Sequence, residues 1–380
     1  MGSGIANAPD ATRIWAEVDL NAIRANLRGI RSRVGPRVRI MAVVKANAYG
    51  HGAVPVALAA EGCEADYLGV AFPEEGAELR TGGARAPIHV FTLSSDHQIP
   101  LYARHHLEPT VCSVRESEAL NRFAQRNKTK FQVHLKIDTG MNRIGVRLDQ
   151  LEQFLKDLAG MRRLEVKGVF THLATADEVD KTFARLQLAR FETALSVLRR
   201  HGVTPEVVHC ANSAAILDLP EAWYSMVRPG IMMYGYYPSA HTSESIRIKP
   251  AMTLKTKAVL VKRVGRGESV SYGRRFIAER ETGIVTLPVG YADGVSRRLT
   301  GLGCAIVNGR RAPFAGTVCM DQVMLDVGRL RVSPGDEVVL IGRQGKQTIS
   351  AWEIATSLGT IPYEVCCAVS ARVPRIYKGL

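Results

Sequence analysis

The first two-thirds of this 380-residue chain alternates short apolar runs with longer stretches of helical periodicity. Eight apolar runs predict strands at residues 40–44, 67–71, 88–93, 109–112, 131–137, 166–171, 206–209 and 225–227. Amphipathic patterns between them predict helices at residues 54–62, 74–82, 115–125, 148–158 and 181–201. Alternating strands and helices form either a closed (β/α)8 barrel of the TIM type or an open doubly wound sheet. We predict the barrel, because the repeat reaches eight and neither a Gly-x-Gly-x-x-Gly fingerprint nor a Walker loop is present.

The pattern changes near residue 245, where short apolar runs separated by Gly-rich turns replace the helical stretches. These runs predict strands at residues 253–261, 284–289, 304–307, 322–325, 337–341 and 366–369. Asn308 and Gly309 lie between two of the runs, which is a strong hairpin signal. We therefore predict an α/β barrel over residues 13–245 and a mostly-β domain over residues 246–380. Residues 1–12 are expected to be flexible or to pack on that second domain.

Composition excludes several classes of protein. With 46% hydrophobic and 23% charged residues the chain is ordinary for a globular protein, and no apolar run is long enough to span a membrane. Residues 1–9 lack the charged and apolar regions of a secretory signal. The seven cysteines are scattered and form no Cys-x-x-Cys motif, so we expect a cytoplasmic protein without a metal site.

The formal net charge of +14 raises the question of a nucleic-acid partner. Lys and Arg are spread along the whole chain, without a long basic block. We therefore favour a basic but well-mixed surface, and we predict no nucleic-acid partner.

Lys45 follows a β-branched apolar run and precedes small residues, Tyr49 and two glycines. A lysine that is desolvated where a strand ends in a cleft can lose its proton and form a Schiff base with a carbonyl compound. Tyr49 and the glycines would hold a phosphate beside it. The alternative is a surface lysine after an ordinary strand.

Polar side chains lie at the carboxyl ends of five of the predicted strands. They are Lys45, Lys136 with Arg143, His172, His209 with Asn212 and Ser213, and Arg228. Because barrel enzymes carry their active sites at the carboxyl ends of the strands, we predict a site there. Ser213 is predicted to cap a helix whose start binds an anion, together with the backbone amides after Arg228. Taken alone, His172 is equally a buried core histidine, and Arg228 is equally part of a structural ion pair.

Nine motifs in one order make the chain similar to the bacterial alanine racemases, fold-type III enzymes that use pyridoxal 5′-phosphate (PLP). The motifs cover residues 43–52, 136–143, 171–172, 211–213, 228–230, 271–273, 290–294, 319–322 and 363–364, and the likeness extends from Trp15 to Arg375. The resemblance implies an isomerase that interconverts L-alanine and D-alanine and supplies D-alanine for cell-wall peptidoglycan. It also implies a homodimer whose active sites are shared between the subunits.

The resemblance assigns a role to each motif. Lys45 would hold PLP, and Arg228 would face its pyridine nitrogen. The remaining cofactor contacts would come from Tyr49, His172, Asn212, Ser213, Gly230, Ile231 and Tyr363. Arg143 would contact the substrate carboxylate, steadied by Lys136 in a carbamylated form. On the substrate side the partner subunit would contribute Tyr272 and Met320, and the residues around them would be Tyr291, Cys319 and Asp321.

Racemisation needs two bases on opposite faces of the cofactor, for which Lys45 and Tyr272 are the natural pair. The pKa of a free tyrosine is about 10, so the phenolate needs a cationic neighbourhood. His172, bridging toward Arg228, would supply it.

One position departs from the pattern. Many members of the family carry an arginine in the substrate corridor where this chain has Thr317, and Arg297 or Arg298 would have to supply that charge. This position puts selectivity against larger amino acids in question, so a racemase of broader amino-acid specificity stays open as an alternative. A second alternative, of a different class, is a non-catalytic PLP-binding carrier on the same barrel.

Overall fold

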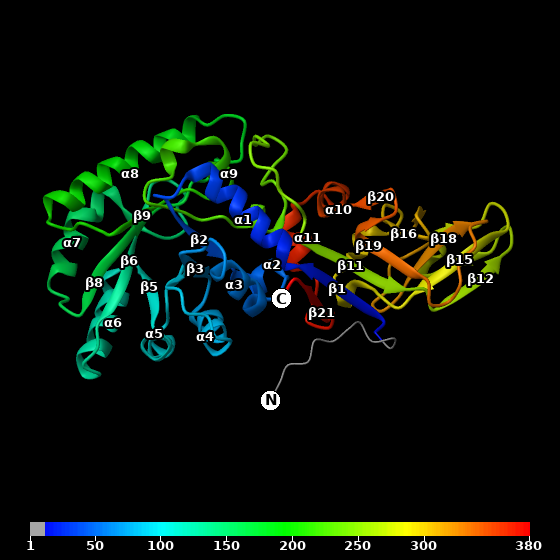
Figure 1. The fold of residues 1–380 in the computed structure, drawn as a ribbon, viewed down its shortest axis with the longest axis horizontal. Coiled ribbons are helices and arrows are strands. Elements are labelled where there is room, and N and C mark those ends of the chain that lie inside the picture. The colour runs from blue at the N-terminus through cyan, green and yellow to red at the C-terminus, as the bar shows by residue number, and fades with distance from the viewer. Residues whose placement is uncertain (1–11) are drawn as a thin grey trace. The chain divides into compact units, whose positions relative to one another are not determined.

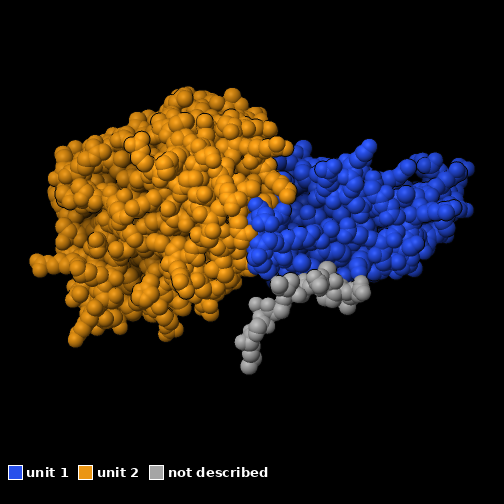
Figure 2. All heavy atoms as spheres, viewed as in Figure 1, with its two compact units in different colours: residues 1–21, 49–52, 250–380 blue, residues 22–48, 53–249 orange. Residues whose placement is uncertain are grey.

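The computed structural model describes residues 12–380, so the predicted N-terminal segment lies outside the described residues except for Thr12. Two compact units account for the fold (Figure 2). Of the described residues, the barrel unit comprises 22–48 and 53–249, and the β-rich unit comprises 12–21, 49–52 and 250–380. The units are interleaved along the chain, whereas the predicted division at residue 245 is a single cut.

Eight parallel strands close into a barrel in the first of these units, which confirms the predicted fold class. They are β2 (Arg39–Val43), β3 (Tyr67–Val70), β4 (Ile88–Val90), β5 (Leu107–Val111), β6 (Phe131–Asp138), β8 (Leu164–Phe170), β9 (Val207–His209) and β10 (Met226–Val227). The β5–β6 and β10–β2 pairings complete the ring. Each strand begins within three residues of a predicted one, because runs buried on both faces stand out as apolar sequence.

Helices connect the strands and lie around the outside of the barrel (Figure 1). They are α1 (Leu20–Val34), α3 (Ala53–Glu61), α4 (Pro73–Thr81), α5 (Ile99–His105), α6 (Val114–Arg126), α7 (Leu151–Ala159), α8 (Thr182–Arg200) and α9 (Ser213–Asp218). Helix α6 shows why they form: the Ser113 hydroxyl caps it by accepting from the Glu116 amide, and Leu120 and Ala124 bury its apolar face.

Two main sheets build the β-rich unit. The larger contains β1 (Ile14–Asp19), β11 (Met252–Lys257), β16 (Cys304–Val307), β17 (Arg310–Pro313), β19 (Glu337–Gln344), β20 (Gln347–Ile349) and β21 (Arg375–Lys378). The smaller contains β12 (Leu260–Val264), β15 (Thr282–Leu287) and β18 (Val323–Gly328), and a separate pair is formed by β13 (Ser269–Val270) and β14 (Phe276–Ile277). Asn308 and Gly309 adopt φ angles of 48° and 71° between β16 and β17, which confirms the predicted hairpin.

Three expectations for this region need correction. The predicted strand at residues 366–369 is wrong, because Pro362 opens helix α11 (Pro362–Cys367) and Val365 and Cys366 are buried on one of its sides. The predicted strand at residues 253–261 is two strands, β11 and β12. Strand β1 was not predicted, and it lies between β11 and β21.

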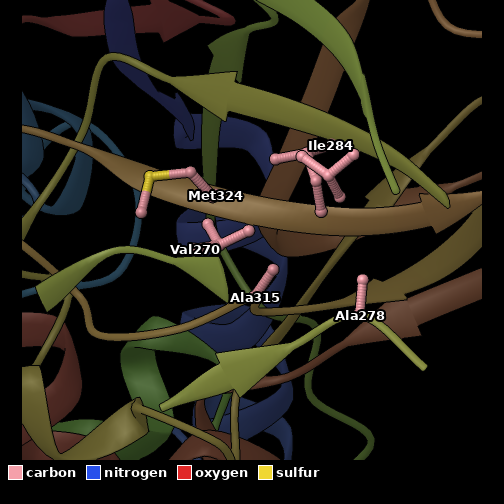
Figure 3. Packing of buried hydrophobic residues seen from close by; sticks show 6 residues of the cluster. Val270, Ala278, Ile284, Ala315 and Met324 are labelled. Atoms are coloured by element: carbon pink, nitrogen blue, oxygen red, sulfur yellow. The ribbon is translucent and has the colours of Figure 1, made fainter. Parts of the chain in front are cut away.

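A small hydrophobic core supports the loop that carries Tyr272. Its members lie close together in Figure 3, and they are Val264, Val270, Ala278, Ile284, Ala315 and Met324. Val270 is buried, whereas Tyr272, two residues later, is 73% exposed. The core therefore fixes the chain immediately before an exposed aromatic side chain.

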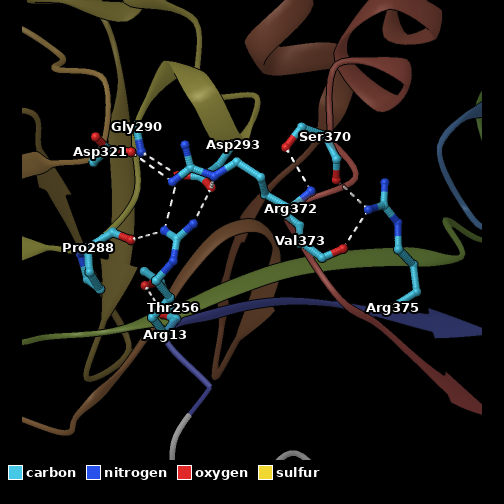
Figure 4. A network of polar contacts seen from close by, with 10 residues as sticks. All are labelled: Arg13, Thr256, Pro288, Gly290, Asp293, Asp321, Ser370, Arg372, Val373 and Arg375. Carbon is cyan, nitrogen blue, oxygen red and sulfur yellow. Dashed lines mark hydrogen bonds and ion pairs between the residues drawn. The ribbon is translucent and has the colours of Figure 1, made fainter.

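The turn after β15 is held by a buried carboxylate (Figure 4). Asp293 is fully buried, forms a two-pronged ion pair with Arg13 at 2.6 and 3.2 Å, and accepts from the Gly290 amide at 3.0 Å. Arg372 approaches the same carboxylate at 3.4 Å. Because a buried charge is stable only when it is paired, this network fixes residues 290–294 on the unit.

Among the described residues, no helix has both the length and the apolar character that crossing a bilayer requires.

Candidate active site

Lys45 begins a turn of unusual hand. The four residues after it, residues 46–49, have φ angles of 52° to 53°, so they form a turn of left-handed helix without a glycine. Such a conformation costs roughly 1–2 kcal/mol for each L-residue, or about 4–8 kcal/mol for four of them. Backbone strain of this size persists only where the surroundings hold it, and it is common at functional sites.

Side chains of the barrel unit hold this turn in place. The Ala46 amide donates to Glu75 Oε1 at 2.7 Å, while Glu75 Oε2 accepts from the Ala71 amide at 2.7 Å and from the Phe72 amide at 3.3 Å. The Ala53 amide donates to Asn47 Oδ1 at 2.8 Å. Glu75 therefore ties the turn after β2 to the loop after β3.

Arg228 lies at the end of β10 and is only 4% exposed. Its Nη2 group lies within hydrogen-bond distance of the Thr171 and Cys210 carbonyl oxygens, at 2.9 and 3.0 Å, and of His172 Nδ1 at 3.1 Å. Burial lowers the pKa of this guanidinium to about 10, so it remains cationic at neutral pH. A buried arginine at a barrel mouth is a fixed positive charge.

His172 stays neutral in these surroundings. Burial holds its pKa well below the usual range, and the positive charges of Arg228, Lys136, Arg143 and Lys45 lower it further. An arginine can only donate, so His172 Nδ1 is the acceptor in their contact and the ring proton is on Nε2.

Lys136 is also buried, at 4% exposure, and its Nζ lies 4.5 Å from the centre of the Phe170 ring. Burial, followed by the charges of Arg228 and Arg143, brings its pKa well below that of an ordinary lysine. Arg143 itself is exposed. The barrel thus contains an amine that is readily unprotonated beside two arginines.

Asn212, Ser213, Gly230 and Ile231 come from the ends of two neighbouring strands. The Gly230 amide donates to Ser213 Oγ at 2.9 Å, which links the start of α9 to the start of the short 3₁₀ helix η4 (Ile231–Tyr234). First-turn N–H groups lack acceptors within their own helix, so two such starts side by side favour an anion. The predicted cap needs a correction: Asn212, whose Oδ1 accepts from the Ala215 amide, is the N-cap, and Ser213 is the first helical residue.

Tyr49 and Tyr363 meet within the β-rich unit, with ring centres 5.9 Å apart. The backbones next to these two tyrosines are closely packed, since a Cβ on Gly50 would lie 2.2 Å from the Cys366 carbonyl oxygen. Burial, followed by the neighbouring Tyr363, raises the pKa of Tyr49, so its hydroxyl stays protonated and can donate to an anion.

The remaining predicted residues gather on one part of the β-rich unit. The Tyr291 amide donates to the Cys319 carbonyl at 3.0 Å, and the Ala292 amide donates to the Met320 carbonyl at 3.1 Å. Asp321 follows in the same loop and pairs with Arg372 at 2.7 Å. Tyr291 and Met320 are 42% and 53% exposed.

Thr317 does not lie in an open corridor. It is 3% exposed, and its hydroxyl donates to the Tyr272 carbonyl at 2.7 Å, while the Ser271 hydroxyl donates to the Thr317 carbonyl at 2.7 Å. Thr317 therefore fixes the backbone of Tyr272. Arg297 and Arg298, the suggested substitutes for a corridor arginine, are both exposed.

Glu75 was missed in the sequence because an acidic residue in the first turn of a helix is common. We expect Glu75→Gln to lower the free energy of unfolding by about 1.5–3 kcal/mol, because one amide oxygen cannot replace a carboxylate that accepts three N–H bonds. Urea unfolding of the purified protein measures this change.

Glu78→Gln is the matched control, since Glu78 is exposed on the same helix. We expect a change within about 0.5 kcal/mol for this variant. Equal stability of the Glu75 and Glu78 variants would contradict the role of Glu75.

Comparison with known proteins identifies the family. The family of alanine racemase N-terminal domains matches residues 18–238, and that of alanine racemase C-terminal domains matches residues 251–377. The alanine racemase of Symbiobacterium thermophilum is 48% identical over 366 residues, which cover 96% of this chain and 97% of that protein. That of Carboxydothermus hydrogenoformans is 45% identical over 368 residues, with coverage of 96% and 99%.

Solved structures give the same result. The alanine racemase of Bacillus anthracis, in a crystal structure with bound L-Ala-P, has a TM-score of 0.93 and 41% identity, covering 98% of this chain and 96% of that one. The enzyme of the D-cycloserine producer Streptomyces lavendulae has a TM-score of 0.92 and 38% identity, covering 97% and 98%. The chain thus belongs to the alanine racemase family.

Proposed function

We propose that this protein interconverts L-alanine and D-alanine with PLP as its cofactor. The observation that carries the proposal is the buried, cationic guanidinium of Arg228 beside a neutral His172, whose pKa is also lowered by the side chains of Arg143, Lys136 and Lys45. A cofactor that carries a phosphate and an acidic phenol, and a substrate that carries a carboxylate, both suit such surroundings.

The donor set fits PLP. The joined starts of α9 and η4, with the Ser213 hydroxyl between them, are suited to the phosphate, and we add Asn212, Gly230, Ile231, Tyr49 and Tyr363 as its neighbours. When bound, PLP withdraws electron density from the α-carbon of an amino acid, so that the α-proton becomes removable. Lys45 is the residue that would carry the cofactor covalently.

Arg228 would face the pyridine nitrogen. Its pKa remains about 10 although it is buried, so it can donate a hydrogen bond without giving up its proton near neutrality. A ring nitrogen left unprotonated makes a weaker electron sink, which limits side reactions.

Lys45 and Tyr272 would move the α-proton, one on each face. With the proton of His172 on Nε2, that nitrogen is able to donate to a phenolate oxygen and favour the ionised form of a tyrosine. As the likeness to the family implies, Tyr272 would come from a partner subunit, and the exposure of Tyr272, Tyr291 and Met320 on the β-rich unit leaves them accessible to such a partner. We therefore propose a homodimer with shared sites, Met320, Cys319, Asp321 and Tyr291 lying near the substrate together with Arg143.

The product would serve as D-alanine for peptidoglycan, and we expect the enzyme to act in the cytoplasm. Because Thr317 is buried, it does not supply the charge of the corridor arginine that it replaces. Rates on alanine, serine and lysine measure how broad the substrate specificity is.

The primary test is proton NMR of L-alanine in D2O with the protein and PLP, together with an enantiomer assay. We expect the α-proton signal to disappear as D-alanine forms, because protons are removed and returned on both faces of the α-carbon.

Lys45→Ala should lose the bound-cofactor absorbance and the activity together, and Tyr272→Phe should keep the absorbance and lose most activity. A Tyr272→Phe variant with full activity would favour the carrier hypothesis, and exchange with retained L configuration would remove Tyr272 from the mechanism.

Lys136 is proposed to react with CO2 and form a carbamate that pairs with Arg143. Its lowered pKa supports this, because only the unprotonated amine can react. We expect a carbamate signal in 13C NMR after incubation with labelled bicarbonate, and its absence from Lys136→Met. A wild-type protein without the signal would leave Lys136 as a free amine.

Thr317→Val should lower kcat about 3- to 10-fold, because the loss of a neutral hydrogen bond worth about 0.5–1.5 kcal/mol releases the Tyr272 backbone. Thr317→Ser keeps the hydroxyl and should retain the wild-type rate. If the two variants lost activity equally, the hydrogen bond from the Thr317 hydroxyl to the Tyr272 carbonyl would not explain the role of Thr317.

A further inference from the structure

A line of hydrogen-bonded side chains crosses the interior of the barrel from Arg228 to Glu108. Arg228 Nη1 lies 3.1 Å from His209 Nδ1, and His209 Nε2 lies 2.9 Å from His134 Nδ1. His134 Nε2 lies 2.8 Å from Glu108 Oε2, and Lys167 Nζ donates to Glu108 Oε1 at 2.7 Å. Both histidines are fully buried, and Glu108 is 6% exposed.

The two ends of this line fix its direction. An arginine only donates, so His209 Nδ1 accepts and the His209 proton is on Nε2. That proton is donated to His134 Nδ1, which leaves the His134 proton on Nε2, facing Glu108. An ionised carboxylate only accepts, so the far end requires the same arrangement.

Neither ring can take up a second proton without placing two hydrogens in one N–N contact. The pKa of His209 agrees with this, since burial, followed by the charge of Arg228, holds it well below the usual range. Burial alone would raise the pKa of Glu108, but hydrogen bonds from His134 and Lys167 outweigh that effect and lower it, so Glu108 is ionised.

A metal site is the competing interpretation, because ligand atoms of His89, His134 and His209 lie within 4.8 Å of one another. Three observations oppose it. The His89 and His134 rings are stacked, with centres 4.1 Å apart, and Arg228 places positive charge nearby. The ring nitrogens that face each other are already used in hydrogen bonds.

We propose that Glu108 is a positioning residue that acts on Arg228 through the two neutral histidines. Its carboxylate compensates the buried guanidinium charge and sets both ring tautomers, so that His209 presents a lone pair to Arg228. This line of side chains orients Arg228 through its Nη1 group, while Thr171, Cys210 and His172 orient it through its Nη2 group. The effect on catalysis rests on the proposed function, but the direction of the hydrogen bonds from Arg228 to Glu108 does not.

The test is 15N NMR of the histidine rings in cofactor-free protein near neutral pH. We expect His134 and His209 of the wild type to be neutral with protons on Nε2. Glu108→Gln should move both protons to Nδ1, because Lys167 attracts the amide oxygen and leaves the NH2 group facing His134. In the loaded enzyme, the lost bond to Arg228 should lower kcat about 10- to 100-fold, the rate equivalent of a hydrogen bond to a charged group.

Lys167→Met is the matched control, and it should leave the tautomers as they are. In the double variant Glu108→Gln with Lys167→Met, the amide oxygen is free to turn to His134, so protons should return to Nε2 and kcat should recover. A wild type with a charged ring or an Nδ1 proton would overturn the proposal, and so would Glu108→Gln without a tautomer change or a double variant without recovery. Absence of alanine racemisation in the wild type would refute the proposed function, and the ring tautomers would still decide this inference.

Discussion

The buried guanidinium of Arg228 is the constraint on which the rest of the barrel mouth depends. A guanidinium taken out of water must direct its N–H groups at acceptors, or the cost of burial unfolds its surroundings. Here the carbonyl oxygens at the ends of β8 and β9 and two neutral histidines meet that need. The side chain of Arg228, at the end of β10, thereby fixes the ends of the two strands before it, and with them the positions of His172 and Asn212.

The left-handed turn after Lys45 is a second place where an unfavourable local conformation is stabilised by its surroundings. It presents the amine at the start of the turn rather than along a helix. Glu75 offsets part of the strain by binding an amide of the turn and two amides of a neighbouring loop. The two cases are alike. The buried Arg228 and the strained turn after Lys45 are each stabilised by hydrogen bonds with residues that follow neighbouring strands of the barrel.

Much of the fold could be predicted from the sequence because the barrel strands are buried on both faces and the helices on one. The hairpin at Asn308 and Gly309 follows from local backbone preference. The helix at Pro362 differs from the predicted strand, since a short apolar run carries no clear period. Strand β1 was missed because its partners are more than 200 residues away in sequence.

The motifs at the strand ends indicated which residues carry chemistry, but not what supports them. Thr317 was interpreted by its position in a motif, whereas its burial and its bond to Tyr272 depend on a loop 45 residues away. The histidine chain was not predicted either. His134 lies inside an apolar strand, and only closure of the barrel brings it between Glu108 and His209.

The interleaving of the two units also limits how the chain can be taken apart. Gly50 and Gly52 fit against Cys366 and Tyr377, where a Cβ on either glycine would meet an atom at 2.2 or 1.8 Å. A segment only four residues after Lys45 thus belongs structurally with the C-terminal part of the chain. The units are therefore not exchangeable modules: a β-rich domain grafted from another protein would have to carry a matching surface for this insert, and a single cut in the gene cannot release an intact barrel.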